Sequence, residues 1–136
     1  MVKPTQISPK TLSNRKQALG RYGEDTAARM LQGCGYLIVE RNWRRAGGEI
    51  DLVARDGDCW VFVEVKTRHG HASGWAEDGM TARKAERITN LGQAWLAEQG
   101  LAEVDWRIDL VAIELDARGA VSRVNHVKAV TADRVG

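Results

Sequence analysis

The sequence predicts one α/β (α+β) domain with a central mixed sheet flanked by helices, in the order α-β-β-β-α-β-β. Two stretches place small and apolar residues at helical spacing, and five short stretches are rich in Val and Ile and bounded by turn residues. The chain of 136 residues is long enough for one buried core and too short for two domains. With 43% apolar residues and no long apolar run, we expect no membrane span.

The first element predicted is a helix over residues 14–34, whose inward face carries Ala27, Ala28 and Leu31. A strand over 36–43 follows, and then a turn around Gly47. The remaining elements are strands over 49–54 and 59–67 joined at Asp56-Gly57, a loop over 69–79, a helix over 81–99 capped by Thr81, and strands over 104–115 and 121–130.

The N-terminal segment and the two cysteines bear on the binding partners and the cellular location of the protein. Residues 1–23 carry five basic residues and no acidic one, and residues 1–13 are predicted to be a flexible basic tail ahead of a single domain over 14–136. Such a tail could bind phosphate or could simply be solvated. Because Cys34 and Cys59 form no CxxC pair and no secretory segment is evident, we expect a cytoplasmic protein.

The predicted hairpin places charged residues inside the sheet. With Asp56-Gly57 as a two-residue turn, Glu49 faces Glu64 and Asp51 faces Phe62. One face of the hairpin is then entirely apolar and well suited to burial. It holds Ile50, Leu52, Ala54, Cys59, Val61, Val63 and Val65. The other face holds Glu49, Asp51, Val53, Trp60, Phe62, Glu64 and Lys66.

This second face gathers three carboxylates and one ammonium on a partly apolar floor. Like charges directly opposite each other destabilise a sheet, so the acids need a partner. A divalent cation bound by carboxylate oxygens is one explanation, and a salt-bridge cluster involving Lys66 and nearby arginines is the other. Glu24 lies beside the inward face of the first helix, where it could be a further metal ligand or could pair with Arg21 or a nearby arginine of the sheet.

Five segments together carry a resemblance to a known family. They are Gly20-Arg21-Tyr22-Gly23-Glu24, Arg41-Asn42-Trp43-Arg44, Gly48-Glu49-Ile50-Asp51, Phe62-Val63-Glu64-Val65-Lys66 and Arg107-Ile108-Asp109. With these segments the chain resembles the YraN family of the PD-(D/E)XK nuclease superfamily over about residues 20–130, and its order and spacing are most similar to archaeal Holliday-junction resolvases. The proline that names the superfamily is replaced here by Ile50.

The resemblance implies a restriction-endonuclease-like fold and a site that hydrolyses DNA phosphodiester bonds with Mg²⁺ or Mn²⁺, with branched or damaged DNA as the candidate substrate. Asp51 and Glu64 would bind the metal with the backbone carbonyl of Val65, and Glu49 would be an auxiliary ligand. Lys66 would orient the attacking water. Glu24 would act on the metal through water. The alternative is a module that binds nucleic acid or protein without cutting.

Basic residues beside the hairpin are candidate phosphate contacts, with solvated surface charges as the alternative. Trp75 could stack on a base or cover the core, and Asp109 is better explained by a structural role than by the active site. Cleavage of two strands would call for a homodimer. The candidate nucleic-acid contacts are Arg41, Arg44, Arg45, Arg83, Lys84 and Arg87.

Overall fold

A computed structural model describes residues 9–70 and 74–130, with side chains from residue 14 onward. The predicted order of elements is confirmed, with one short 3-10 helix added in the segment predicted to be a loop. None of the described helices is long and apolar enough to cross a membrane. The elements are α1 (Pro9–Gly33), β1 (Leu37–Arg45), β2 (Gly48–Asp56), β3 (Cys59–His69), η1 (Ala76–Gly79), α2 (Ala82–Glu98), β4 (Trp106–Leu115) and β5 (Val121–Val127).

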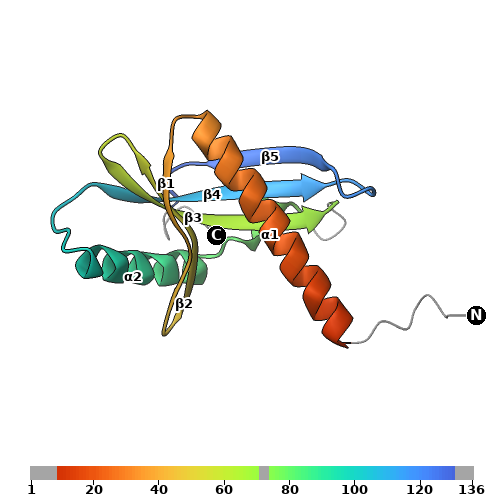
Figure 1. Cartoon of the computed structure of the whole chain (residues 1–136), viewed down its shortest axis with the longest axis horizontal. Helices are drawn as coiled ribbons and strands as arrows, with labels where there is room; N and C mark the ends of the chain where they lie inside the picture. Colours follow the sequence, from red (N-terminus) through yellow and green to blue (C-terminus); the bar gives the residue numbers. More distant parts are fainter. Residues whose placement is uncertain (1–8, 71–73, 131–136) are drawn as a thin grey trace, which may run out of the picture.

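The five strands form one mixed sheet in the order β1-β2-β3-β4-β5 (Figure 1). Strands β3 and β4 are parallel because α2 carries the chain back between them, and the other neighbours are antiparallel. The two long helices cover opposite faces of this sheet. The predicted α+β fold of restriction-endonuclease type is therefore the one observed.

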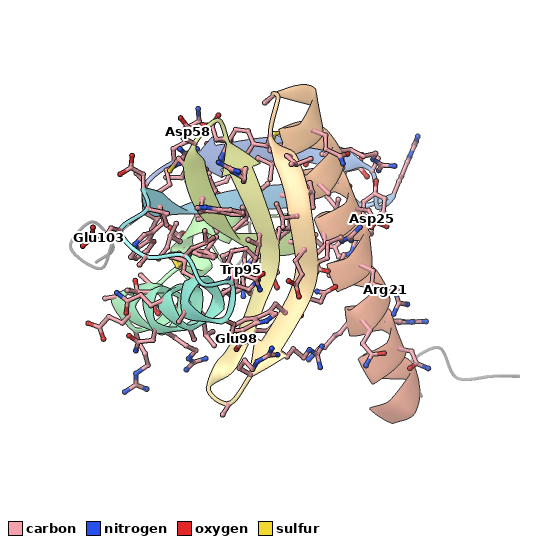
Figure 2. All side chains as sticks on the ribbon, turned by 60° about the vertical axis from the view of Figure 1, so that its left-hand side comes forward. Arg21, Asp25, Asp58, Trp95, Glu98 and Glu103 are labelled. Atoms are coloured by element: carbon pink, nitrogen blue, oxygen red, sulfur yellow. The ribbon has the colours of Figure 1, made fainter. Side chains whose placement is uncertain are left out.

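Alternating residues of β3 supply both cores. Val61 and Val63 pack with Leu31 of α1 in one buried cluster. Phe62 packs with Trp95 of α2 in the other, and Figure 2 shows Trp95 between α2 and the curved β1–β2 pair. Strand β3 is thus buried on both faces, which fixes the hairpin relative to the two helices.

The ends of several elements differ from the prediction. Helix α1 begins at Pro9 instead of residue 14, and residues 1–8 of the predicted basic tail lie outside the described residues. Helix α2 is capped as predicted, since the Thr81 hydroxyl accepts a hydrogen bond from the Lys84 N–H.

The hairpin turn lies one residue later in the chain than predicted, so the predicted register is wrong. Asp56 pairs with Cys59, so the turn is Gly57-Asp58 and each pair is displaced by two residues from the prediction. Gly57 has φ of 60°, and a two-residue hairpin turn of type II′ wants glycine at its first position. Because two residues is one side-chain period, the displacement changes the partners across the hairpin without exchanging its faces.

One residue of the predicted apolar face lies elsewhere. Ile50 packs with Trp43 in the core cluster under α2, whereas Leu52 packs in the cluster under α1. Regular alternation would put both on one face. The interruption falls beside Asn42 of β1, whose φ of 53° departs from the β region and bends the strand pair.

Two glycines of α1 make a matched test of how closely this helix approaches the sheet. A Cβ on Gly23 would lie 1.9 Å from Thr67 Oγ1 of β3, whereas a Cβ on Gly20 would meet nothing within 4 Å. We expect Gly23→Ala to lower the free energy of unfolding by about 1–3 kcal/mol through overpacking. We expect Gly20→Ala to raise it by about 0.5–1 kcal/mol. Urea denaturation measures both, and equal effects would contradict the close approach.

Candidate metal centre

Three carboxylates from two elements lie close together beside strand β2. Glu24 extends from α1, and Glu49 and Asp51 extend from β2. One oxygen from each of these residues lies within 4.8 Å of the others, and all three residues are partly buried. Among the described residues, none forms an ion pair with Glu24 or Asp51, so the predicted pair between Glu24 and Arg21 is not formed. The salt-bridge explanation therefore leaves two acids without a cation.

A fourth carboxylate, Glu64 of β3, lies against Asp51. Phe62 pairs with Val53 and not with Asp51, so the register that predicted the pairing of Glu49 with Glu64 is wrong, and Asp51 instead feels the charge of Glu64. The ladder between β2 and β3 ends at Leu52. Asp51 Oδ2 then accepts a hydrogen bond of 2.8 Å from the N–H of Val65 and so satisfies a donor that the ladder leaves free.

Burial makes these two acids hard to ionise, and nearby carboxylates add to the effect. Desolvation, followed by the charge of Glu64, raises the pKa of Asp51 to about 8. Desolvation also raises the pKa of Glu64, against the opposing charges of Lys84 and Lys66. Near neutral pH the pair therefore retains a proton that a bound cation would displace.

Two lysines from different elements stand beside Glu64. Burial lowers the pKa of Lys66, and the neighbouring charge of Lys84 lowers it further. Lys84, at the start of α2, lines a narrow cleft of about 90 Å³ together with Glu49, Glu64 and Arg87. The sequence assigned Lys84 to the flanking surface, whereas the fold brings it to the acids themselves.

The six candidate phosphate contacts fall into two groups. Arg41 pairs with Asp25 of α1 at 2.6 Å. Arg45 forms a two-bond pair with Glu98 of α2, at 2.6 and 2.9 Å. Figure 2 shows these two acids on the helices at either side of the hairpin. Such paired arginines are poorly placed to bind phosphate, because each would have to leave a carboxylate.

The other four cations are available. Arg44 has a side chain 77% exposed and lies 3.5 Å from Glu49. Arg87 is exposed and lines the same narrow cleft as Lys84. Arg83 is also exposed and has no ion pair among the described residues. The structure thus brings Arg44, Lys84 and Arg87 to the carboxylates and leaves Arg83 at the outer side of α2.

Sequence reasoning missed two residues of this site, Arg21 and Asn42. Both line a wider cleft of about 480 Å³ between α1 and the β1–β2 hairpin. Asn42 donates hydrogen bonds of 2.8 Å to both Glu24 and Glu49. For Asn42 the signal available in the sequence was its residue type, since asparagine is among the few residues that tolerate the left-handed backbone conformation. For Arg21 the only signal was its position three residues before Glu24, one helical turn away.

Two other residues singled out in the sequence have structural partners. Asp109 is fully buried and bonds to Arg107 Nε at 3.0 Å and to His126 Nε2 at 2.8 Å. This buried and bonded position confirms the prediction that Asp109 has a structural role. Trp75 is 45% exposed and carries the Arg123 guanidinium 4.5 Å from its ring centre. Its stacking on a base stays a prediction.

Together, the fold and the site define a restriction-endonuclease-like α+β domain with an acidic cluster at the point where β2 and β3 separate. The family model described as "Uncharacterised protein family UPF0102" matches residues 23–113. The chain belongs to this family, UPF0102, which is the YraN family.

Curated relatives match nearly the whole chain. The chain is 49% identical over 115 residues to a UPF0102 protein of a Nocardioides species, covering 85% of this chain and 92% of the relative. It is 47% identical over 115 residues to a UPF0102 protein of Beutenbergia cavernae, covering 85% and 97%. It is 48% identical over 119 residues to a UPF0102 protein of Streptomyces coelicolor, covering 86% and 91%. These names state membership of the family and no activity.

Proposed function

We propose that the protein is a Mg²⁺- or Mn²⁺-dependent endonuclease that hydrolyses phosphodiester bonds in DNA. The observation that carries the proposal is the meeting of Glu24, Glu49 and Asp51 within 4.8 Å, while no described residue forms an ion pair with Glu24 or Asp51. Carboxylate oxygens are the ligands that these hard cations prefer. The donor set therefore fits the ion that the resemblance implies.

Each residue has a role that follows from its place. Asp51, Glu49 and Glu64 would hold the ion, with the carbonyl of Val65 as a further ligand, and Glu24 would act through water. When bound, the ion lowers the pKa of water and offsets charge on phosphate. Lys66 would orient the attacking water beside Glu64, and its lowered pKa suits a group that accepts a proton. Lys84 would place a positive charge against the phosphate.

The substrate class is inferred from the cations that line the two clefts. Arg21 and Arg44 line the wide cleft, and Lys84 and Arg87 line the narrow one. Glu49 lines both clefts, so positive charges flank the acids on two sides. A polyanion such as DNA would contact both flanks at once, and this contact would be weakened by salt. A homodimer would supply the second site needed to cut both strands.

The alternative proposal is a module that binds nucleic acid without cutting it. The same flanking cations favour it. A module of this kind would gain nothing from buried acids that repel phosphate. Removing one carboxylate would leave its affinity for DNA unchanged or higher.

Cleavage of labelled DNA separates the two proposals. Linear, nicked, flapped and four-way-junction substrates are incubated with Mn²⁺ and wild-type protein, Glu64→Gln or Glu86→Gln. We expect Glu64→Gln to cut at least 100-fold more slowly than wild type, because it removes an anionic ligand. Glu86 is an exposed acid of α2, and its substitution should leave the rate unchanged. Cleavage that persists in Glu64→Gln would refute the assigned site.

A further inference from the structure

Asn42 has a backbone conformation that its place in a strand does not require. Its φ is 53°, whereas its neighbours in β1 pair regularly with β2, Arg41 with Leu52 and Trp43 with Ile50. The left-handed region is unfavourable for most residues with a side chain, and asparagine is one of the few that tolerate it. Such outliers persist where the surrounding structure holds them, often at functional sites.

The conformation brings the side-chain amide of Asn42 between two carboxylates. Its Nδ2 donates to Glu24 Oε1 and to Glu49 Oε1, at 2.8 Å each. An amide nitrogen carries two hydrogens, so both of its donors are used. Glu24 belongs to α1 and Glu49 to β2, so one side chain of β1 joins the helix to the hairpin.

The chemistry of this bridge suits a cation site. The amide is neutral, so it holds two like charges near each other without cancelling them. It bonds to a single oxygen of each carboxylate. Within the described part of the chain, the second oxygen of Glu24 then has no hydrogen bond, and that of Glu49 has only the long contact to Arg44. A lysine or arginine in this place would neutralise the acids and compete with a metal ion.

We propose that Asn42 is a positioning residue of the metal centre, which holds Glu24 and Glu49 in place before a cation binds. This inference rests on the proposed function, since it needs the carboxylates to bind a divalent cation. Groups that orient metal ligands commonly change metal affinity 10–100-fold when they are removed. The side chain, and not only the bent backbone, is assigned this role.

Two substitutions at Asn42 separate the side chain from the backbone. Asn42→Gly keeps access to a positive φ and removes the amide, whereas Asn42→Ala removes the amide and also disfavours that φ. A role confined to the bent backbone would weaken Mn²⁺ binding in Asn42→Ala and spare it in Asn42→Gly. A role for the amide weakens binding in both variants alike.

The experiment is calorimetric titration of metal-free protein with Mn²⁺. We expect the dissociation constants of Asn42→Gly and Asn42→Ala to rise about 10–100-fold above wild type. The control is Asn125→Ala, which removes a similar 2.9 Å bond from an asparagine to Glu77, an acid outside the cluster, and should bind Mn²⁺ as wild type does. Thermal unfolding of metal-free Asn42→Gly should stay close to that of wild type, which excludes a general loss of structure.

A second readout does not depend on the variants. In a titration with diamagnetic Mg²⁺, the side-chain NH₂ resonances of Asn42 should shift and saturate, while those of Asn125 stay in place. Binding by Asn42→Gly within twofold of wild type would overturn the positioning role and leave the metal site standing. A wild-type protein that binds neither ion would overturn the proposed function and this inference together.

Discussion

Asp51→Asn is expected to make the metal-free protein more stable while removing one carboxylate of the proposed metal site. Burial and Glu64 raise the pKa of Asp51 to about 8, from an ordinary value of 3.8. Folding therefore takes up a proton between these two values, and stability falls as pH rises through this range. The asparagine variant is free of this penalty and can still accept the hydrogen bond from Val65. We expect a gain of about 1–3 kcal/mol at pH 7.

The measurement is urea denaturation with a chelator at several pH values. The gain of Asp51→Asn over wild type should be small near pH 4, should grow up to about pH 8, and should then level off. The control is Asp58→Asn, because the Asp58 side chain is fully exposed in the hairpin turn. A gain that does not change with pH would show that Asp51 is ionised as easily as a surface acid.

Asp109→Ala is expected to have the largest effect on stability. The buried carboxylate of Asp109 bonds to Arg107, His126, the Tyr36 hydroxyl at 3.3 Å and the N–H of Ala129 at 3.1 Å. Its removal would leave the Arg107 charge with only the half-exposed Asp56, and would leave the other donors without their acceptor. Breaking a buried ion pair from one side commonly costs about 3–5 kcal/mol, and we expect a loss in this range.

Urea denaturation at pH 7 measures this loss against Asp105→Ala. Asp105 is exposed and lies just before the same strand, so its substitution should change stability by less than about 0.5 kcal/mol. The Asp109 network includes none of the four acids of the metal centre. Any folded Asp109→Ala protein should therefore bind Mn²⁺ as wild type does. Loss of Mn²⁺ binding without a loss of stability would instead make Asp109 a wall of the active site.

Periodicity predicted which residues of the hairpin share a face, but it could not predict their partners. The alternation of Val61, Phe62 and Val63 places two residues under α1 and one under α2, as observed. The partner of each residue depends on the turn, and either Asp56-Gly57 or Gly57-Asp58 satisfies the same alternation. The conformational need for glycine at the first turn position decided between them.

The candidate site was only partly visible in the sequence because its members come from five elements. Glu49, Asp51 and Glu64 could be found, since charged residues inside strands are unusual. Lys84 joins them because α2 packs across the sheet, and no local pattern encodes that approach. The pairs that occupy Arg41 and Arg45 also depend on tertiary contacts, with Asp25 and Glu98.

Asn42 shows a different limit. Its role depends on a positive φ inside a strand, and strand patterns predict extended backbone throughout. Sequence reasoning included it in the segment that resembles the YraN family but had no physical ground for assigning it a contact. Its two bonds to carboxylates became evident only when α1 and β2 were placed on either side of it.

The most direct test of the central claim is a calorimetric titration of the metal-free wild-type protein with Mn²⁺ up to millimolar concentration, beside Asp51→Asn and with DNA both absent and present. The account predicts saturable binding by wild type and its loss in Asp51→Asn, because that substitution removes a charge from the ligand set. Equal binding by both proteins, or no binding by wild type even with DNA, would contradict a metal centre at these carboxylates.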